Sequence, residues 1–141
     1  MSVPELAARH RLQPHPEGGW YRQTWASPVE VAVPDGEGAV RTRPTATLIL
    51  FLLTAGESSA WHRVLSDEVW IAQVGGVVVE LGGDESEPGE GPRFRLGLDD
   101  DDHPQVLVPA GVWQRTLPTD HDVLVSCLVS PGFDFEDFRL A

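Results

Sequence analysis

Lysine is missing from this sequence: all ten basic residues are arginines, against 22 acidic residues, which leaves a formal net charge of -12 at pH 7. Without lysine, the chain cannot form a Schiff base and cannot contain a P-loop. The excess of acidic residues repels phosphate backbones and anionic lipid surfaces. We therefore expect neither nucleic acid nor a membrane as a partner.

Cysteine and long apolar runs are scarce. Cys127 is the only cysteine, which excludes an intrachain disulfide and any paired-cysteine redox or zinc site. It lies in the apolar run 123–129 and is expected to be a buried, unreactive thiol. The longest apolar run, residues 48–53, is much shorter than the roughly 20 residues that cross a bilayer, and the N-terminus lacks the hydrophobic region of a signal peptide. A cytoplasmic protein is expected.

The 141 residues suit one domain spanning 1–141, and most of them predict β-structure. Ser2-Val3-Pro4-Glu5 has the spacing of a capping box, so a short helix is expected at residues 3–10. Later, short apolar or alternating runs are separated by Gly, Pro and Asp, as in an all-β sandwich or barrel. Gly75-Gly76 is expected to make a hairpin turn, and residues 28–38 and 82–92 to form exposed loops. The expected strands cover residues 45–54, 68–74, 77–81, 93–98, 105–108, 113–117 and 123–129.

Two spaced motifs lie within this β-rich region. Gly56-Glu-Ser-Ser-Ala-Trp-His62-Arg-Val64-Leu-Ser-Asp-Glu68, followed after six intervening residues by Gly75, resembles the first cupin motif, in which His-x-His precedes a glutamate and a glycine. One position departs from it, because Val64 replaces the second histidine. Pro109-Ala-Gly-Val-Trp-Gln114 resembles the second cupin motif, with Gln114 in place of its histidine. Two such motifs in this order are much more specific than either alone.

Further segments narrow the resemblance to the small single-domain cupin family catalogued as a domain of unknown function (Cupin_5-like). The resemblance implies an all-β fold, a cupin jelly-roll β-barrel with a short N-terminal helix and a short C-terminal tail segment. It also implies a homodimer and a solvent-reachable pocket, but no settled reaction. The segments that carry it are Pro14-His-Pro-Glu-Gly-Gly-Trp-Tyr-Arg22, Trp61-His-Arg-Val64, Asp67-Glu-Val-Trp70, the second motif and Pro131-Gly-Phe-Asp-Phe-Glu-Asp-Phe138.

The motif positions predict where a small-molecule pocket lies. Small barrels hold a ligand inside because strands alternate inward and outward residues, and His62, Glu68 and Gln114 are the expected inward polar group. A cupin with the full motif would hold a divalent transition metal on three histidines and a glutamate. This sequence keeps one histidine, His62, and the glutamate, Glu68, at the matching positions, and Gln114 is a weak neutral donor. Only weak or adventitious metal binding is therefore expected. His15, His103 and His121 lie outside the motifs and are expected at the surface or in loops.

The same residues suit acid–base chemistry without a cofactor. His62 would act as general base or acid while Glu68 orients its imidazole, and Gln114 or Tyr21 would donate a hydrogen bond to a developing enolate oxygen. The segment 14–22 is expected to cross the pocket mouth, where Arg22 would grip a carboxylate or phosphate. The expected substrate-binding residues are Glu17, Arg22, Gln114 and Trp113.

Three functions remain open from the sequence. The leading hypothesis is an isomerase, epimerase or lyase that acts on an oxygenated anionic metabolite through His62 and Glu68. The second is a metal-dependent oxygenase or lyase with His62, Glu68 and Gln114 as ligands, and the third is a non-catalytic binding or sensor barrel. The tail at residues 133–138, in which phenylalanines alternate with acids, is expected to cover the barrel or the dimer interface.

Overall fold

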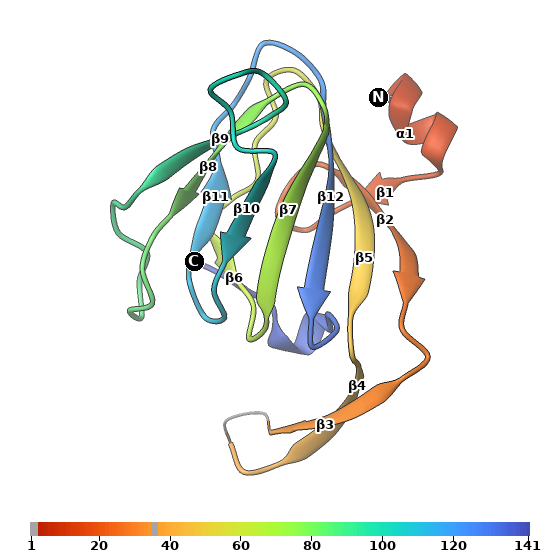
Figure 1. Cartoon of the computed structure of the whole chain (residues 1–141), viewed down its shortest axis with the longest axis vertical. Helices are drawn as coiled ribbons and strands as arrows, with labels where there is room; N and C mark the ends of the chain where they lie inside the picture. The colour runs from red at the N-terminus through yellow and green to blue at the C-terminus, as the bar shows by residue number, and fades with distance from the viewer. Residues whose placement is uncertain (1–2, 35–36) are drawn as a thin grey trace.

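The computed structural model describes residues 3–34 and 37–141, which form two antiparallel sheets facing each other and a separate hairpin (Figure 1). The six-stranded sheet has the order β1 (Gln13–Pro14), β2 (Trp20–Ala26), β5 (Thr47–Leu53), β12 (Val123–Ser130), β7 (Asp67–Val74), β10 (Gln105–Val108). The five-stranded sheet has the order β13 (Arg139–Leu140), β6 (His62–Arg63), β11 (Gln114–Thr116), β8 (Val77–Leu81), β9 (Arg93–Leu96). The hairpin pairs β3 (Glu30–Pro34) with β4 (Val40–Pro44).

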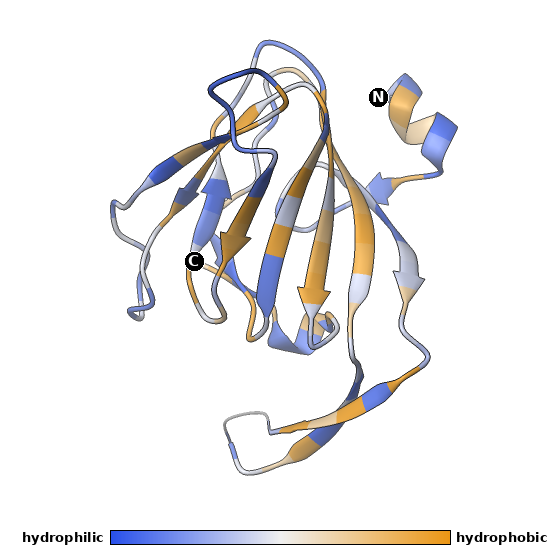
Figure 2. Ribbon diagram, in the orientation of Figure 1, coloured by the Kyte–Doolittle hydropathy of each residue, from blue (hydrophilic) through white to orange (hydrophobic). Residues whose placement is uncertain are grey.

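The core fills the space between the two sheets. Alternation along β7 turns Glu68, Trp70 and Ala72 inward, because successive side chains of a strand point to opposite faces. Apolar residues dominate the middle strands, while the connecting loops are mostly polar (Figure 2). The buried residues of this core are Phe51, Leu53, Trp70, Ala72, Val77, Val79, Leu96, Val106, Val108, Val123, Val125 and Cys127. The prediction that Cys127 is buried is therefore confirmed.

Helix α1 (Glu5–His10) covers the outer face of the six-stranded sheet. Ala7 is fully buried there against a small cluster that includes Leu52 and Leu124. The helix begins two residues later than expected, after Pro4, and the predicted capping residue Ser2 lies outside the described residues. None of the described helices is long and apolar enough to span a membrane.

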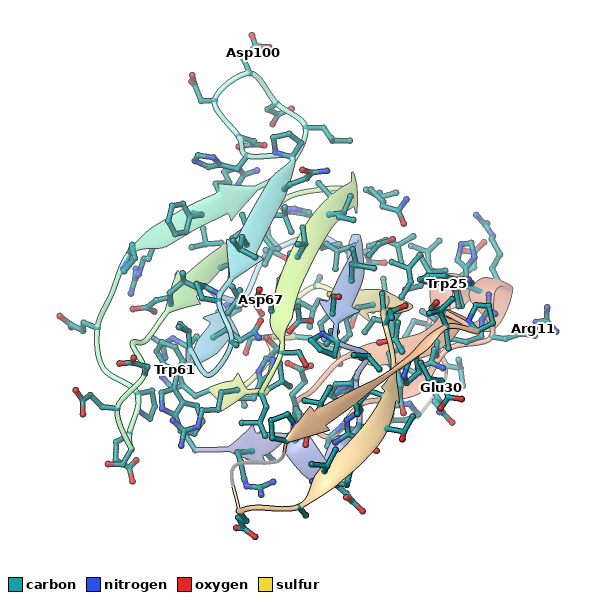
Figure 3. All side chains as sticks on the ribbon, turned by 60° about the horizontal axis from the view of Figure 1, so that its bottom comes forward. Arg11, Trp25, Glu30, Trp61, Asp67 and Asp100 are labelled. Carbon is teal, nitrogen blue, oxygen red and sulfur yellow. The ribbon has the colours of Figure 1, made fainter. Side chains whose placement is uncertain are left out.

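All seven expected strands are present, with ends that differ by a few residues. The hairpin turn predicted at Gly75-Gly76 is wrong, because β7 and β8 lie in different sheets and the turn carries the chain from one sheet to the other. Only Gly75 of the two has a positive φ, 71°. The exposed loop at 82–92 is confirmed. A second loop, which is acidic and carries Asp100 at its tip, also projects into solvent (Figure 3).

The loop expected at 28–38 is wrong in part, because it contains β3. Val29, Val31 and Val33 alternate with Glu30 and Ala32, which is the period of a strand. The flanking prolines Pro28 and Pro34 obscured this pattern in the sequence. The resulting β3–β4 hairpin projects from the end of the barrel near the tail, as Figure 1 shows.

Candidate functional site

A cavity of about 400 Å³ opens at the end of the barrel where the C-terminal tail crosses between the sheets. This volume lies in the lower part of the range of roughly 300–1,000 Å³ for small-molecule sites. Strands β2, β5, β6, β7 and β12, the segment before β2 and the tail all contribute to its wall. The lining residues are Gln13, His15, Glu17, Tyr21, Gln23, Thr47, Ile49, His62, Val64, Glu68, Val129, Phe133, Asp134, Phe135 and Phe138.

His62 lies in the wall of this cavity and is only 2% exposed. Its Nδ1 lies 2.8 Å from the carbonyl oxygen of Ala60 and 2.8 Å from Oε2 of Glu17. Burial acts to lower the pKa of His62, but the Glu17 carboxylate and then Glu68 outweigh it and raise the pKa to about 9. His62 is therefore an imidazolium at neutral pH. Both ring nitrogens of an imidazolium carry a proton, so Nε2 of His62 has an N–H to donate.

The sequence assigned Glu68 to orient His62, and the structure corrects this: Glu17 contacts the imidazole. A tight turn brings Glu17 inward. Gly18 and Gly19 have φ of 103° and 81°, and a Cβ on Gly18 would lie 2.5 Å from the carbonyl oxygen of Ser58. The turn is held by the Ala60 amide, which donates to the Glu17 carbonyl at 2.8 Å. Only glycine allows this close approach.

His15 lies beside Glu17 in the loop between β1 and β2, as one of the two positions expected for it, and it is buried. Four aromatic rings surround it, with centroids 4.7–5.8 Å away: Tyr21, Phe51, Phe135 and Phe138. Burial is the main reason that its pKa falls below 6.5. The Glu17 amide donates to Nδ1 of His15 at 3.1 Å. The neutral ring therefore carries its proton on Nε2.

Glu68 ends a chain of buried hydrogen bonds. Nε2 of Gln114 donates to Oε1 of Glu68 at 2.8 Å, and Nε1 of Trp70 donates to Oε1 of Gln114 at 2.7 Å. Burial raises the pKa of Glu68, against the opposing charge of His62. Gln114 is thus behind Glu68 rather than in the cavity wall, and it orients the carboxyl group.

These residues do not fit a transition-metal site. Gln114 offers its only strong acceptor to Trp70 and Val64 has no donor atom, so only two of the four motif positions, His62 and Glu68, could bind a metal. Within residues 3–34 and 37–141, no three histidine, cysteine, aspartate or glutamate side chains gather in a way that could hold a metal ion.

The C-terminal tail covers the cavity. The sequence predicted that it would cover either the barrel or the dimer interface, and the first of these positions is observed. Phe133, Phe135 and Phe138 line the wall, and the ring of Phe138 stacks on His62 with centroids 5.5 Å apart. The tail continues into β13, whose Leu140 pairs with His62 in β6. The tail therefore connects the two sheets directly over the site.

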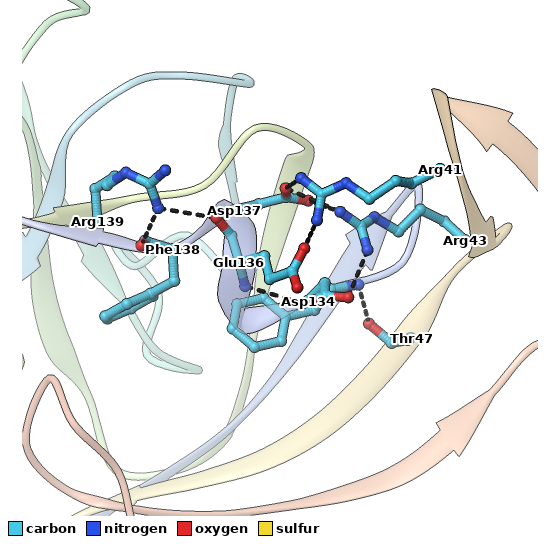
Figure 4. A network of polar contacts seen from close by, with 9 residues as sticks. Arg41, Arg43, Thr47, Asp134, Glu136, Asp137, Phe138 and Arg139 are labelled. Atoms are coloured by element: carbon cyan, nitrogen blue, oxygen red, sulfur yellow. Dashed lines mark hydrogen bonds and ion pairs between the residues drawn. The ribbon is translucent and has the colours of Figure 1, made fainter. Parts of the chain in front are cut away.

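Two arginines of β4 fasten the tail (Figure 4). Arg43 is buried and binds Asp137 through two contacts of 2.9 and 2.8 Å, and its Nη1 lies 2.5 Å from Asp134. Arg41 pairs with Glu136 and also approaches Asp137 at 3.6 Å. The acids of the tail are thus paired with β4, which explains their alternation with the inward phenylalanines.

Of the four residues expected to bind substrate, Glu17 lines the cavity, whereas Gln114, Arg22 and Trp113 do not. Nε of Arg22 donates to the His10 carbonyl at 2.7 Å, so Arg22 supports α1. Nε1 of Trp113 donates to the Glu85 carbonyl at 2.8 Å. The guanidinium of Arg63 lies over the ring of Trp113. Tyr21, expected as a hydrogen-bond donor, does line the cavity.

Two antiparallel sheets that enclose a polar cavity at the positions of both cupin motifs define a cupin barrel. The chain belongs to the Cupin_5 family of the cupin superfamily (DUF985), which it matches over residues 4–141. It is 34% identical over 151 residues to the uncharacterized protein YML079W of Saccharomyces cerevisiae, covering 96% of this chain and 73% of that protein.

Solved structures agree with this assignment. Protein SO0799 from Shewanella oneidensis is 34% identical, with a TM-score of 0.82 over 100% of this chain and 85% of that one. A Cupin 2 conserved barrel domain protein from Salinispora arenicola is 18% identical, with a TM-score of 0.59 over 92% of this chain and 88% of that one. The second likeness shows the fold alone, and it confirms the jelly-roll barrel.

Proposed function

We propose that this cupin is an acid–base enzyme of the isomerase, epimerase or lyase class, with His62 as the acid and Glu68 as the base. The observation that carries the proposal is the pair of His62 and Glu17, buried in the wall of the cavity that Glu68 also lines. Acid and base partners in catalysis are typically two titratable groups whose surroundings separate their pKa values.

The reaction begins with a proton on the carbon next to a substrate carbonyl group. Burial raises the pKa of Glu68, which makes its carboxylate a stronger base than an exposed one. Glu68 takes the C–H proton, the electron pair of that bond forms the C=C bond of an enolate, and the π pair of the carbonyl group moves onto its oxygen. The Nε2 proton of His62 and the hydroxyl of Tyr21 stabilise the enolate oxygen. Return of the proton gives an isomer or epimer, and loss of a substituent on the next carbon gives a lyase product.

Incorporation of deuterium tests this mechanism without a known substrate. A metabolite extract is incubated with the protein in D2O, and mass spectrometry identifies compounds that gain one mass unit. We expect label with the wild type and at least about a 100-fold slower gain with His62→Gln or Glu68→Gln, since acid–base groups contribute roughly 10²–10⁴-fold. His103→Gln is the matched control, because His103 is exposed and packs on Phe94 away from the cavity.

The remaining two hypotheses make different predictions. Wild-type protein that binds a metabolite but transfers no label to it would indicate a binding or sensor barrel. Metal analysis of protein purified without a histidine tag tests His62, Glu68 and Gln114 as metal ligands. We expect less than about a tenth of an equivalent per chain, because tight sites retain their ion. A stoichiometric metal that His62→Gln loses would replace our proposal.

A further inference from the structure

The ionised side chains that line the cavity are already paired within the protein. His62 lies 2.8 Å from Glu17, so this cation and this anion compensate each other. Asp134 lies 2.5 Å from Arg43, which approaches from outside the cavity wall. Neither pair leaves a full charge to attract a ligand of opposite sign.

The two other titratable groups in the wall, His15 and Glu68, add no unpaired charge. His15 is held among four aromatic rings and accepts a hydrogen bond at Nδ1, as a neutral imidazole does. Glu68 is buried, accepts a hydrogen bond from Gln114 and feels the opposite charge of His62. Burial of an unpaired ion is costly, so a ligand ion would need a free charge that none of these groups offers.

No arginine is among the described residues that line the cavity, although the chain has ten. The candidates nearest in sequence and space are engaged elsewhere: Arg22 with the His10 carbonyl, and Arg43 with the tail. A guanidinium is the usual means of gripping a carboxylate or phosphate. The expected anion contact from Arg22 is therefore not made by this structure.

The wall offers both hydrogen-bonding groups and aromatic rings. His62, Glu68 and Tyr21 come from β6, β7 and β2 and offer hydrogen-bonding groups. Phe133, Phe135 and Phe138 come from the tail and pack edge to face, with centroids 4.8–6.3 Å apart. Such rings form an apolar surface that suits the C–H side of a ligand.

We infer that the cavity takes an uncharged, oxygenated molecule, with its hydroxyl or carbonyl groups against His62, Glu68 and Tyr21 and its C–H face against the tail phenylalanines. This ligand class rests on the proposed function for its orientation, and it replaces the anionic metabolite expected from the sequence. An uncharged ligand leaves both ion pairs intact. A charged ligand would lose its hydration in the cavity without meeting an unpaired charge of opposite sign on the protein.

Three probes that share a cyclohexane ring test the charge: cyclohexanecarboxamide, cyclohexanecarboxylate and cyclohexylmethylammonium. Their dissociation constants are measured by ligand-observed NMR at pH 7.5. We expect the amide to bind at least about ten times more tightly than either ion. Equal or tighter binding of the carboxylate or the ammonium ion would overturn the inference, and so would no detectable binding of the amide.

An unpaired positive charge introduced at the mouth of the cavity should reverse the order of the affinities of the amide and the carboxylate. Gln23 is exposed and lines the cavity. Gln23→Arg should tighten carboxylate binding at least about tenfold and leave the amide nearly unchanged. Gln23→Met is the matched control and should keep the wild-type order. If Gln23→Arg leaves the affinity for the carboxylate unchanged, the claim that the charge of the cavity selects its ligand is contradicted.

The probe experiment tests the ligand class and the deuterium experiment tests the acid–base mechanism, so either claim can be contradicted without the other. Preference for the amide without any label transfer would preserve the ligand class and remove the acid–base mechanism. Label transfer that depends on His62 but occurs only on anionic metabolites would remove the ligand class and preserve the mechanism.

Discussion

A buried histidine normally loses its charge, because burial lowers the pKa of imidazole. His62 is the exception in this barrel because Glu17 supplies a carboxylate at 2.8 Å. The motif spacing located His62 and Glu68 in one interior, but it could not show that Glu17 is the contact. That contact depends on the Gly18-Gly19 turn, whose direction is set by packing on the Ser58 carbonyl.

Stability should depend on pH through His62. Its pKa is about 9 in the folded chain against 6.5 in the unfolded one, so the folded chain holds the proton more tightly. The contribution is fully present below pH 6.5 and is lost as the pH rises to about 9, on the order of 3 kcal/mol. Urea unfolding at pH 6.5 and 9.5 measures this loss.

The matched variant for this prediction is His62→Gln, which has no charge to lose. Its free energy of unfolding should change much less than that of the wild type between the two pH values. An equal loss in both proteins would assign the pH dependence to other groups, such as Glu68 or His15.

Gln114 should be important for stability rather than for direct ligand contact. Gln114→Leu keeps the volume but leaves Nε1 of Trp70 and Oε1 of Glu68 without partners. We expect a loss of about 2–4 kcal/mol in urea unfolding, since each buried unsatisfied group costs roughly 1–3 kcal/mol. Gln105→Leu on the exposed side of β10 is the control, and a similar loss there would contradict this role.

At the scale of elements, the tail is the part whose position the sequence predicted least completely. The alternation of phenylalanine and acid indicated a covering segment. The partners Arg41 and Arg43 come from β4, which the sequence did not reveal because Val40 and the arginines around Thr42 lack an apolar alternation. A contact between segments so far apart in the chain leaves no local pattern.

Arg43→Gln should release the tail. It removes both contacts to Asp137, a carboxylate that is only 8% exposed, and breaking such a pair costs roughly 3–5 kcal/mol. The amides of Phe138 and Ala141, which donate to Phe135 and Trp61, should exchange hydrogen faster. Arg139→Gln removes only exposed bonds to backbone carbonyls and is the control. Unchanged exchange in Arg43→Gln would show that the contacts of Arg43 are not needed to hold the tail, which Arg41 and the phenylalanines also contact.

The strands from residue 45 onward were predictable because each is a short apolar or alternating run between Gly, Pro and Asp. The exchange of sheets at Gly75-Gly76 was not, since a two-residue glycine turn serves a hairpin or a sheet crossing equally well. Tertiary pairing of β7 with β12 and β10 decides between them.

For the whole molecule, we expect a homodimer. β1 pairs with β2 only at Trp20 and Tyr21, so the later part of β2 presents an edge within the described region. Trp25, Val31 and Val40 are exposed near it. An open edge with apolar neighbours favours association. Sedimentation should give twice the chain mass of 15.4 kDa.

A paired variant locates this interface. Trp25→Glu with Val31→Lys should shift the mass to that of one chain, while Leu98→Lys, exposed on a loop distant in sequence, should not. A wild type that sediments at 15.4 kDa at micromolar concentration would contradict the dimer.

The charge of His62 is the centre of this account, and an NMR titration of the histidine ring nitrogens measures it directly. We predict that both nitrogens of His62 carry protons at pH 7.5, that the midpoint lies near 9, and that Glu17→Gln lowers it by about one pH unit or more. A midpoint at or below 6.5 in the wild type, or one that Glu17→Gln does not change, would contradict the ion pair and the acid role built on it.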